Sequence, residues 1–277
     1  MPRNNQDRLI DKKKPEDDSS PASVNALLDF VVPSEFVDLP TKGKFYSKDH
    51  PWHDKESVEI KYMTAKETDI LTSQQLLKKG IAVDRMLQNL VVDKEVRVSE
   101  LFTGDKNALL MAARISGFGR SYDASVTCRN CNTTSEKSFD LGELNIREAP
   151  EDVNYGSNGT FFITLPQTKI KAECRLLTGV DEKKLSEKGD KKKKLKLPES
   201  TLTDQLKLVI VSLNGVTDRS AVEEFVDVMP AQDSNHLRNE YDKMRPDIDL
   251  SYEFDCEGCD TLNIINIPFS VNFFWPE

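Results

Sequence analysis

Hydrophobic and polar positions follow strand-like and helix-like periods in turn along this chain. Residues 57–63 and 161–173 alternate apolar and polar side chains, which predicts strands. Residues 64–80 predict a helix, because Thr64 and Glu67 are spaced as a capping box and Gly80 supplies a stop. Further helices are predicted where apolar residues recur at helical spacing, over 83–91, 98–119, 202–216 and 220–244.

The order of these elements repeats along the chain. A strand, helices and a Cys-x-x-Cys motif occur in residues 23–150 and again in residues 151–277. The two motifs are separated by the same offset as Asp105 and Asp233. We interpret this order as an internal duplication, and chance recurrence of common elements is the alternative.

These patterns predict an α+β fold with two related lobes. Each lobe is expected to hold a strand and helices and to end in a Cys-x-x-Cys β-hairpin, and the lobes are expected to join at a shared zinc-knuckle site. The predicted domains are an N-terminal lobe over 23–150 and a C-terminal lobe over 151–277. Residues 1–22 are charged and nearly devoid of large apolar side chains, so we expect a disordered tail.

Two Cys-x-x-Cys motifs carry the main chemical signal. Each can place two thiolates on one side of a turn, and structural zinc takes four ligands in a tetrahedron. One motif therefore supplies half of a site, and a duplicated fold would bring both halves together. The predicted zinc ligands are Cys128, Cys131, Cys256 and Cys259. Asn130 and Gly258 precede the second cysteine of each motif, where we expect a positive φ.

Other uses of the cysteines remain open. A redox pair needs its motif at the start of a helix, whereas strands are expected on both sides of these turns. Unmetalled core thiols are a further alternative. Cys174 has no neighbouring partner in sequence and is expected to be a small buried hydrophobe.

Composition narrows the class of protein. The 277 residues carry a formal net charge of −9, which argues against non-specific binding to nucleic acid or anionic lipid. No apolar run has the length of a membrane span, and the first residues lack the apolar core of a secretory signal. A reducing cytoplasm is therefore expected, where structural disulfides are rare.

No catalytic constellation is found. His50 and His53 are close in sequence and could touch a metal, but we expect them to be surface loop residues. Residues 191–196 read KKKKLK, for which a flexible loop is expected and contact with an acidic partner protein is the alternative. Phe273, Phe274 and Trp275 either cover the core near the zinc or form an anchor for a partner.

The chain resembles the baseplate-hub proteins of T4-like tailed bacteriophages over residues 33–277. The similarity lies in LPTKGKFY, VEIKYMTAKETDILTS, LLKKGIAVDRMLQNLV, the Cys-x-x-Cys hairpins and the closing FFWP. The resemblance implies a non-enzymatic structural protein or assembly chaperone of the central hub of a contractile-tail baseplate. The N-terminal arm and the basic run depart from the family pattern.

We therefore expect a hub structural or assembly protein folded around structural Zn²⁺. Its expected partners are other phage baseplate hub proteins, with no nucleic acid, no membrane and no small-molecule substrate. It would act in the host cytoplasm during assembly, with the virion tail baseplate as a destination. The alternatives are a zinc-ribbon nucleic-acid-binding protein and a thiol oxidoreductase.

Overall fold

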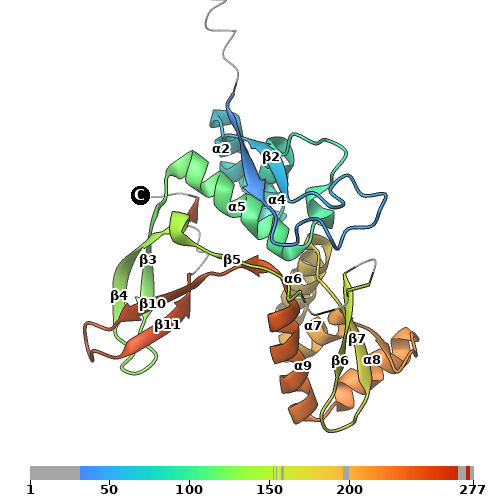
Figure 1. Ribbon diagram of the computed structural model, residues 1–277. Helices are drawn as coiled ribbons and strands as arrows, with labels where there is room; N and C mark the ends of the chain where they lie inside the picture. Colours follow the sequence, from blue (N-terminus) through green and yellow to red (C-terminus); the bar gives the residue numbers. More distant parts are fainter. Residues whose placement is uncertain are drawn as a thin grey trace, which may run out of the picture. The chain divides into compact units, whose positions relative to one another are not determined.

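Helices and small antiparallel sheets make up the structure (Figure 1), which confirms the mixed helix and sheet class. The computed structural model describes residues 32–151, 153, 155–156, 159–195, 200–267 and 273–274. The helices are α2 (Ala65–Thr72), α3 (Gln74–Lys78), α4 (Ala82–Leu90), η2 (Val98–Glu100), α5 (Thr103–Phe118), η3 (Leu141–Glu143), α6 (Gly179–Lys194), α7 (Thr201–Val209), α8 (Arg219–Val228) and α9 (Ala231–Met244). The strands are β1 (Ser34–Asp38), β2 (Ser57–Lys61), β3 (Ser121–Thr127), β4 (Thr134–Asp140), β5 (Ile146–Arg147), β6 (Thr160–Thr164), β7 (Lys171–Arg175), β8 (Ile210–Leu213), β9 (Asp247–Ile248), β10 (Ser251–Asp255) and β11 (Leu262–Asn266).

The chain from Ser34 onward forms one compact unit. The predicted tail, residues 1–22, lies outside the described residues. Among the residues that the structure describes, no helix has both the length and the apolar character that crossing a membrane requires.

A β-hairpin opens this unit. β1 pairs with β2 in antiparallel register, and their alternating residues Val37, Val58 and Ile60 are buried. α5 packs against β1, and Val91, which follows α4, bridges to Ile60. The hairpin thus buries one face because apolar side chains occupy every second position of each strand.

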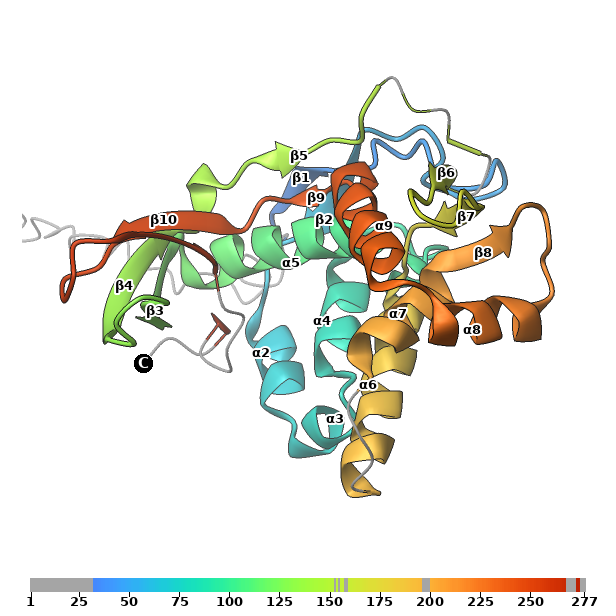
Figure 2. The same cartoon turned by 90° about the horizontal axis from the view of Figure 1, so that it is seen from below.

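A second hairpin begins the other half of the chain. β6 pairs with β7, and β7 pairs with β8, all antiparallel. Phe161, Ile163, Ala172 and Cys174 alternate along the first two strands and are buried. α6 and α7 lie side by side (Figure 2). Asp204 of α7 forms ion pairs with Lys188 and Lys192 of α6, which hold the two helices together.

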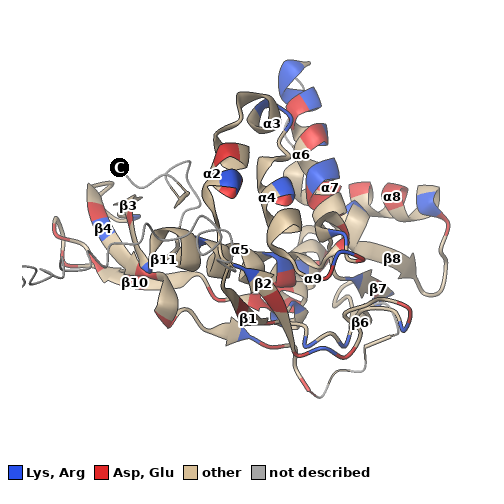
Figure 3. Ribbon diagram, turned by 90° about the horizontal axis from the view of Figure 1, so that it is seen from above, with Lys and Arg blue, Asp and Glu red and all other residues tan. Residues whose placement is uncertain are grey.

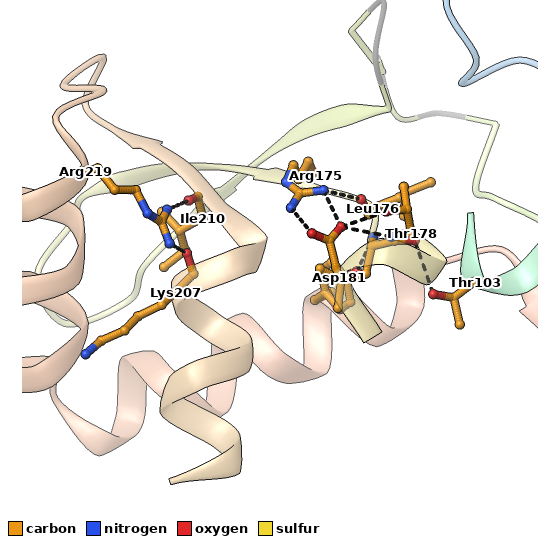
Figure 4. A network of polar contacts seen from close by, with 10 residues as sticks. Thr103, Arg175, Leu176, Thr178, Asp181, Lys207, Ile210 and Arg219 are labelled. Carbon is orange, nitrogen blue, oxygen red and sulfur yellow. Dashed lines mark hydrogen bonds and ion pairs between the residues drawn. The ribbon is translucent and has the colours of Figure 1, made fainter. Parts of the chain in front are cut away.

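Capping boxes begin the first helix after each hairpin. The backbone N–H of Thr64 donates to Glu67 in α2, and that of Thr178 donates to Asp181 in α6, each at 3.0 Å. Arg175 of β7 adds a bidentate ion pair to Asp181, at 2.7 and 2.8 Å (Figure 4). The first turn of α6 is therefore anchored to the strand that precedes it, since bidentate pairs fix geometry as well as charge.

Backbone contacts join the two halves of the chain. Phe102 bridges to Thr178, and β5 pairs with β9. Gly104 lies so near this junction that a Cβ atom there would come within 2.1 Å of the carbonyl oxygen of Pro246. Glycine at this position allows the start of α5 to approach the segment before β9.

The structure corrects several expected elements. The helix expected over 64–80 is divided at Ser73, and the one over 220–244 is divided between α8 and α9 at Met229 and Pro230. The helix expected over 202–216 ends at Val209, and β8 follows because its backbone pairs with β7.

The basic run was also expected to be a flexible loop, and for Lys191–Lys194 this is wrong. These lysines form the last turn of α6, where positive charge is favoured by the helix dipole. Residues 196–199 lie outside the described residues.

Candidate metal centre

Two hairpins present the Cys-x-x-Cys motifs. Cys128 and Cys131 lie in the turn between β3 and β4, and Cys256 and Cys259 lie in the turn between β10 and β11. The turns use the same backbone bonds. The N–H of the first cysteine donates to the carbonyl of Thr133 or Thr261, at 2.9 and 3.1 Å, and its own carbonyl accepts an N–H four residues later.

The positive φ angles of these turns occur one residue after the second cysteine. Asn132 has φ 57° and Asp260 has φ 51°, so the expectation for Asn130 and Gly258 is wrong. Gly258 has a different role. A Cβ atom there would lie 2.8 Å from Thr133 Oγ1, so glycine lets the second turn approach the first hairpin closely.

The four sulfur atoms converge. All of them lie within 4.8 Å of one another. Cys128 Sγ is 3.8 Å from Cys259 Sγ, and Cys131 Sγ is 3.5 Å from Cys256 Sγ. Four sulfurs bonded to zinc at about 2.3 Å in a tetrahedron would be about 3.8 Å apart. The spacing therefore fits a closed four-thiolate metal site, and it is too long for disulfide bonds.

Polar hydrogens surround the sulfurs. The backbone N–H of Asn130 donates to Cys128 Sγ at 3.4 Å, and that of Gly258 donates to Cys256 Sγ at 3.3 Å. Asn130 Nδ2 also lies 3.6 Å from Cys259 Sγ. Such donors favour the thiolate form, which is the form that binds metal.

The metal-free thiols differ in acidity. The pKa of Cys259 is lowered to about 6 by its hydrogen bonds with the side chains of Thr261 and Asn130. The pKa of Cys256 is raised to about 11: the Gly258 N–H lowers it, but burial and the neighbouring sulfurs outweigh that effect. Four thiolates this close repel one another, so a cation such as Zn²⁺ would allow all four to ionise.

Asn263 links the two motifs, and sequence reasoning missed it. This β11 residue is buried at 5% exposure. Its Nδ2 donates to Cys128 Sγ at 3.4 Å, and its Oδ1 accepts the backbone N–H of Arg129 at 3.1 Å. The side-chain amide of Asn263 thus contacts both the candidate metal ligand Cys128 and the backbone of the turn in the opposite hairpin. No signal in the sequence marked this position, because alternation with Leu262 and Ile264 would place Asn263 on the outward face.

Replacing Asn263 should loosen the metal site. In Asn263→Leu, the Arg129 N–H loses its acceptor and Cys128 loses a donor, while the branched shape of the side chain is kept at a larger volume. We expect zinc to bind about 10–100-fold more weakly, the usual cost of removing an outer-shell partner. Competition with a chromophoric chelator measures this. Asn266→Leu, an exposed change on the same strand, is the control and should keep the wild-type affinity. Equal affinities for all three proteins would exclude this role.

Two of the three closing aromatics, Phe273 and Phe274, are buried in the structure. Phe273 and Phe274 are buried at 2% and 5% exposure and pack edge-on against Tyr122 and Phe118 respectively. The guanidinium of the buried Arg114 lies 5.8 Å from the Phe273 ring centroid. Trp275 lies outside the described residues. The role of these three aromatics in binding a partner stays a prediction.

The other candidate residues stand apart from the sulfur cluster. His50 stacks on Tyr46 at 4.2 Å, and His53 Nδ1 lies 2.8 Å from the Tyr46 carbonyl oxygen. Cys174 is fully buried, and burial raises the pKa of its thiol to about 12, as expected for a small hydrophobe. Within the described part of the chain, the four cysteines form the one cluster whose ligand atoms could hold a metal.

One of three comparisons with known proteins gives a match. Searches against curated proteins and against solved structures gave no significant match. The family model described as T4 bacteriophage base plate protein matches residues 34–275, from β1 to the closing aromatics. This match spans most of the chain, including both Cys-x-x-Cys hairpins, and the chain therefore belongs to the T4 bacteriophage base plate protein family.

Proposed function

We propose that this protein is a non-enzymatic structural or assembly component of the baseplate hub, folded around one structural zinc ion. Membership of the base plate family supports a structural role in the phage tail. The observation that carries the proposal is the meeting of four sulfurs from distant parts of the chain. Cys128, Cys131, Cys256 and Cys259 would be the ligands, and they leave no open position for catalysis on the metal.

The zinc would join two related lobes, residues 23–150 and 151–277. The β1–β2 and β6–β7 hairpins support this duplication. Ser34 pairs with Lys61 in the β1–β2 hairpin, and Thr160 pairs with Arg175 in the β6–β7 hairpin. Both hairpins continue in step from these pairs, with Phe36 opposite Glu59 and Phe162 opposite Glu173.

Polar contacts at matching places also support the duplication. Asp105 and Asp233 are both the third residue of their helices, α5 and α9, and both are fully buried. Each accepts backbone N–H groups from the loop after a Leu-Pro pair, from Thr41 in one half and from Gln167 and Thr168 in the other. Recurrence of a buried contact is stronger support than recurrence of an element type, because it depends on tertiary position.

Other hub proteins would be the partners of this chain, during assembly in the host cytoplasm and then in the virion tail. The closing aromatics Phe273, Phe274 and Trp275 are proposed as one partner contact. Because Phe273 and Phe274 are buried, contact through their rings requires the C-terminal segment to leave its site. Interface cores are enriched in such side chains.

Metal content tests the proposal. We expect one zinc per chain by elemental mass spectrometry. In the native protein we expect the four clustered thiols, as well as the buried Cys174, to be shielded from a thiol reagent. A chelator without denaturant should expose the four clustered thiols first. A metal-free protein whose clustered thiols react at once, or form disulfides, would contradict the proposed zinc site.

A further inference from the structure

The outward faces of the two Cys-x-x-Cys hairpins differ in chemistry. Counted from the second cysteine, Thr134 and Glu136 of β4 occupy the places of Leu262 and Ile264 in β11. Leu262 is 57% exposed and Ile264 is 54% exposed. The first hairpin thus presents polar side chains where the second presents aliphatic ones.

The β11 pattern is reversed relative to a strand that only covers a core. Asn263, between the two aliphatic residues, is buried, whereas its apolar neighbours face outward. Leu262 and Ile264 are two residues apart, so their side chains lie on the same face of the strand. Burying two such side chains in a partner would remove apolar surface from water, which favours association.

This apolar pair borders an open depression with a volume of about 380 Å³. Residues of both Cys-x-x-Cys hairpins line it: Arg129 and Asn130 from the β3–β4 turn, and Thr261, Leu262, Asn263 and Ile264 from the β10–β11 hairpin. Any segment bound there would contact both hairpins. The shape of the depression therefore depends on the cysteine cluster that holds the two turns together.

Three acidic side chains lie near the pair, together with one basic residue of the lining, Arg129. Asp255 is opposite Leu262 and Glu253 is opposite Ile264 across the hairpin, and Asp260 lies in the turn. All three are exposed, and Figure 3 colours acidic positions of this hairpin red. Glu257 is paired with Lys137, but none of the ion pairs found among the described residues includes Glu253, Asp255 or Asp260.

We propose that the outward face of β10–β11 binds an extended segment of a neighbouring subunit that presents aliphatic side chains flanked by Lys or Arg. The spacing of Leu262 and Ile264 matches alternate residues of an extended segment, and the acidic groups beside them complement its positive charges. That the neighbour is a baseplate subunit rests on the proposed function, but the chemistry of the face does not.

The first hairpin supplies the test variant. Leu262→Thr with Ile264→Gln gives β11 polar outward residues, as in β4, without a new acidic group that would itself attract Lys, and these exposed changes should leave the fold and metal content unaltered. Thr134→Ala with Glu136→Ala is the matched control on the other hairpin. The probe is a blocked seven-residue peptide of alternating Lys and Leu, titrated into the ¹⁵N-labelled full chain. The second probe replaces each Lys with Glu.

The Lys peptide should shift amide resonances of residues 261–266 and of Arg129 and Asn130 in the wild type and in the control. The β11 variant should bind at least tenfold more weakly, and the Glu peptide should shift none of these resonances. Equal binding by wild type and variant, equal binding of the two peptides, or shifts confined to other surfaces would overturn the proposal. Zinc content measured on the same samples separates the two proposals, since a metal-free wild type that still binds here would contradict the metal site alone.

Discussion

Cys128→Ser should lose the metal and much of the fold together. Three thiolates hold zinc less tightly than four, and the binding free energy of structural zinc is part of the folding free energy. Cys128 is fully buried, so a water molecule can hardly enter to take the place of the missing thiolate ligand. A loss of about 5 kcal/mol would be comparable to the whole stability of many domains. For a chain of this length it corresponds to a fall in Tm of about 10–20 °C.

Differential scanning calorimetry with and without a chelator measures this effect. Cys174→Ser is the control, because that thiol is buried away from the cluster and should cost core stability without any loss of zinc. Chelation should lower the Tm of the wild type and of Cys174→Ser, and it should change Cys128→Ser much less. A Cys128→Ser protein with the wild-type Tm and a full complement of zinc would remove the metal from the folding argument.

The meeting of the cysteines could be anticipated because metal chemistry demands it. Two motifs each supply two thiolates, a closed zinc site needs four, and a duplicated fold gives a geometry in which they meet. The structure brings the four sulfurs together across more than a hundred residues of intervening chain. Asn263 could not be assigned a role in advance, since its contacts with Cys128 and Arg129 exist only once the hairpins are side by side.

Elements that depend on tertiary contacts were also out of reach. The run from Leu206 to Leu213 is apolar enough for a helix or a strand, and the division at Ile210 follows from pairing with β7. The lysine run reads as a loop in isolation, but Lys188 and Lys192 lie one turn apart on α6 and both reach Asp204 of α7. Because Asp204 lies on a different helix, a pattern within α6 alone could not indicate this contact. The two ammonium groups help to hold the pKa of Asp204 at about 2 against the effect of burial.

Asp105→Asn should change how stability depends on pH. Asp105 is fully buried; Oδ1 accepts the Thr41 N–H at 3.0 Å, and Oδ2 accepts the hydroxyls of Thr41 at 2.6 Å and Tyr46 at 2.7 Å. Burial raises the pKa of this carboxyl from 3.8 to about 6, and the hydrogen bonds only partly oppose that rise. The folded protein therefore binds more protons here than the unfolded chain between these two values.

Stability from this group consequently falls as the pH rises through that window. The full difference corresponds to about 3 kcal/mol, of which about 1 kcal/mol falls between pH 5 and pH 7. The variant has no proton to lose at this position. Its amide also has a single acceptor oxygen, so either the two hydroxyls or the Thr41 N–H lose their acceptor, which costs about 1–3 kcal/mol at every pH. The advantage of the wild type over the variant should therefore be larger at pH 5 than at pH 7.

Urea unfolding of both proteins at pH 5, 6 and 7 tests this expectation, since contributions common to both cancel in the difference. Asp233→Asn is the matched control from the other half of the chain. Although burial opposes ionisation, the N–H groups of Gln167 and Thr168 hold the pKa of Asp233 below its usual value. Its contribution is present above the unfolded-state pKa and is lost only as the pH falls through the lower folded-state pKa, so the cost of Asp233→Asn should stay constant from pH 5 to pH 7. If the loss in free energy of unfolding had the same pH dependence in both variants, the two aspartates would share one charge state over this range. Burial would then not dominate the pKa of Asp105.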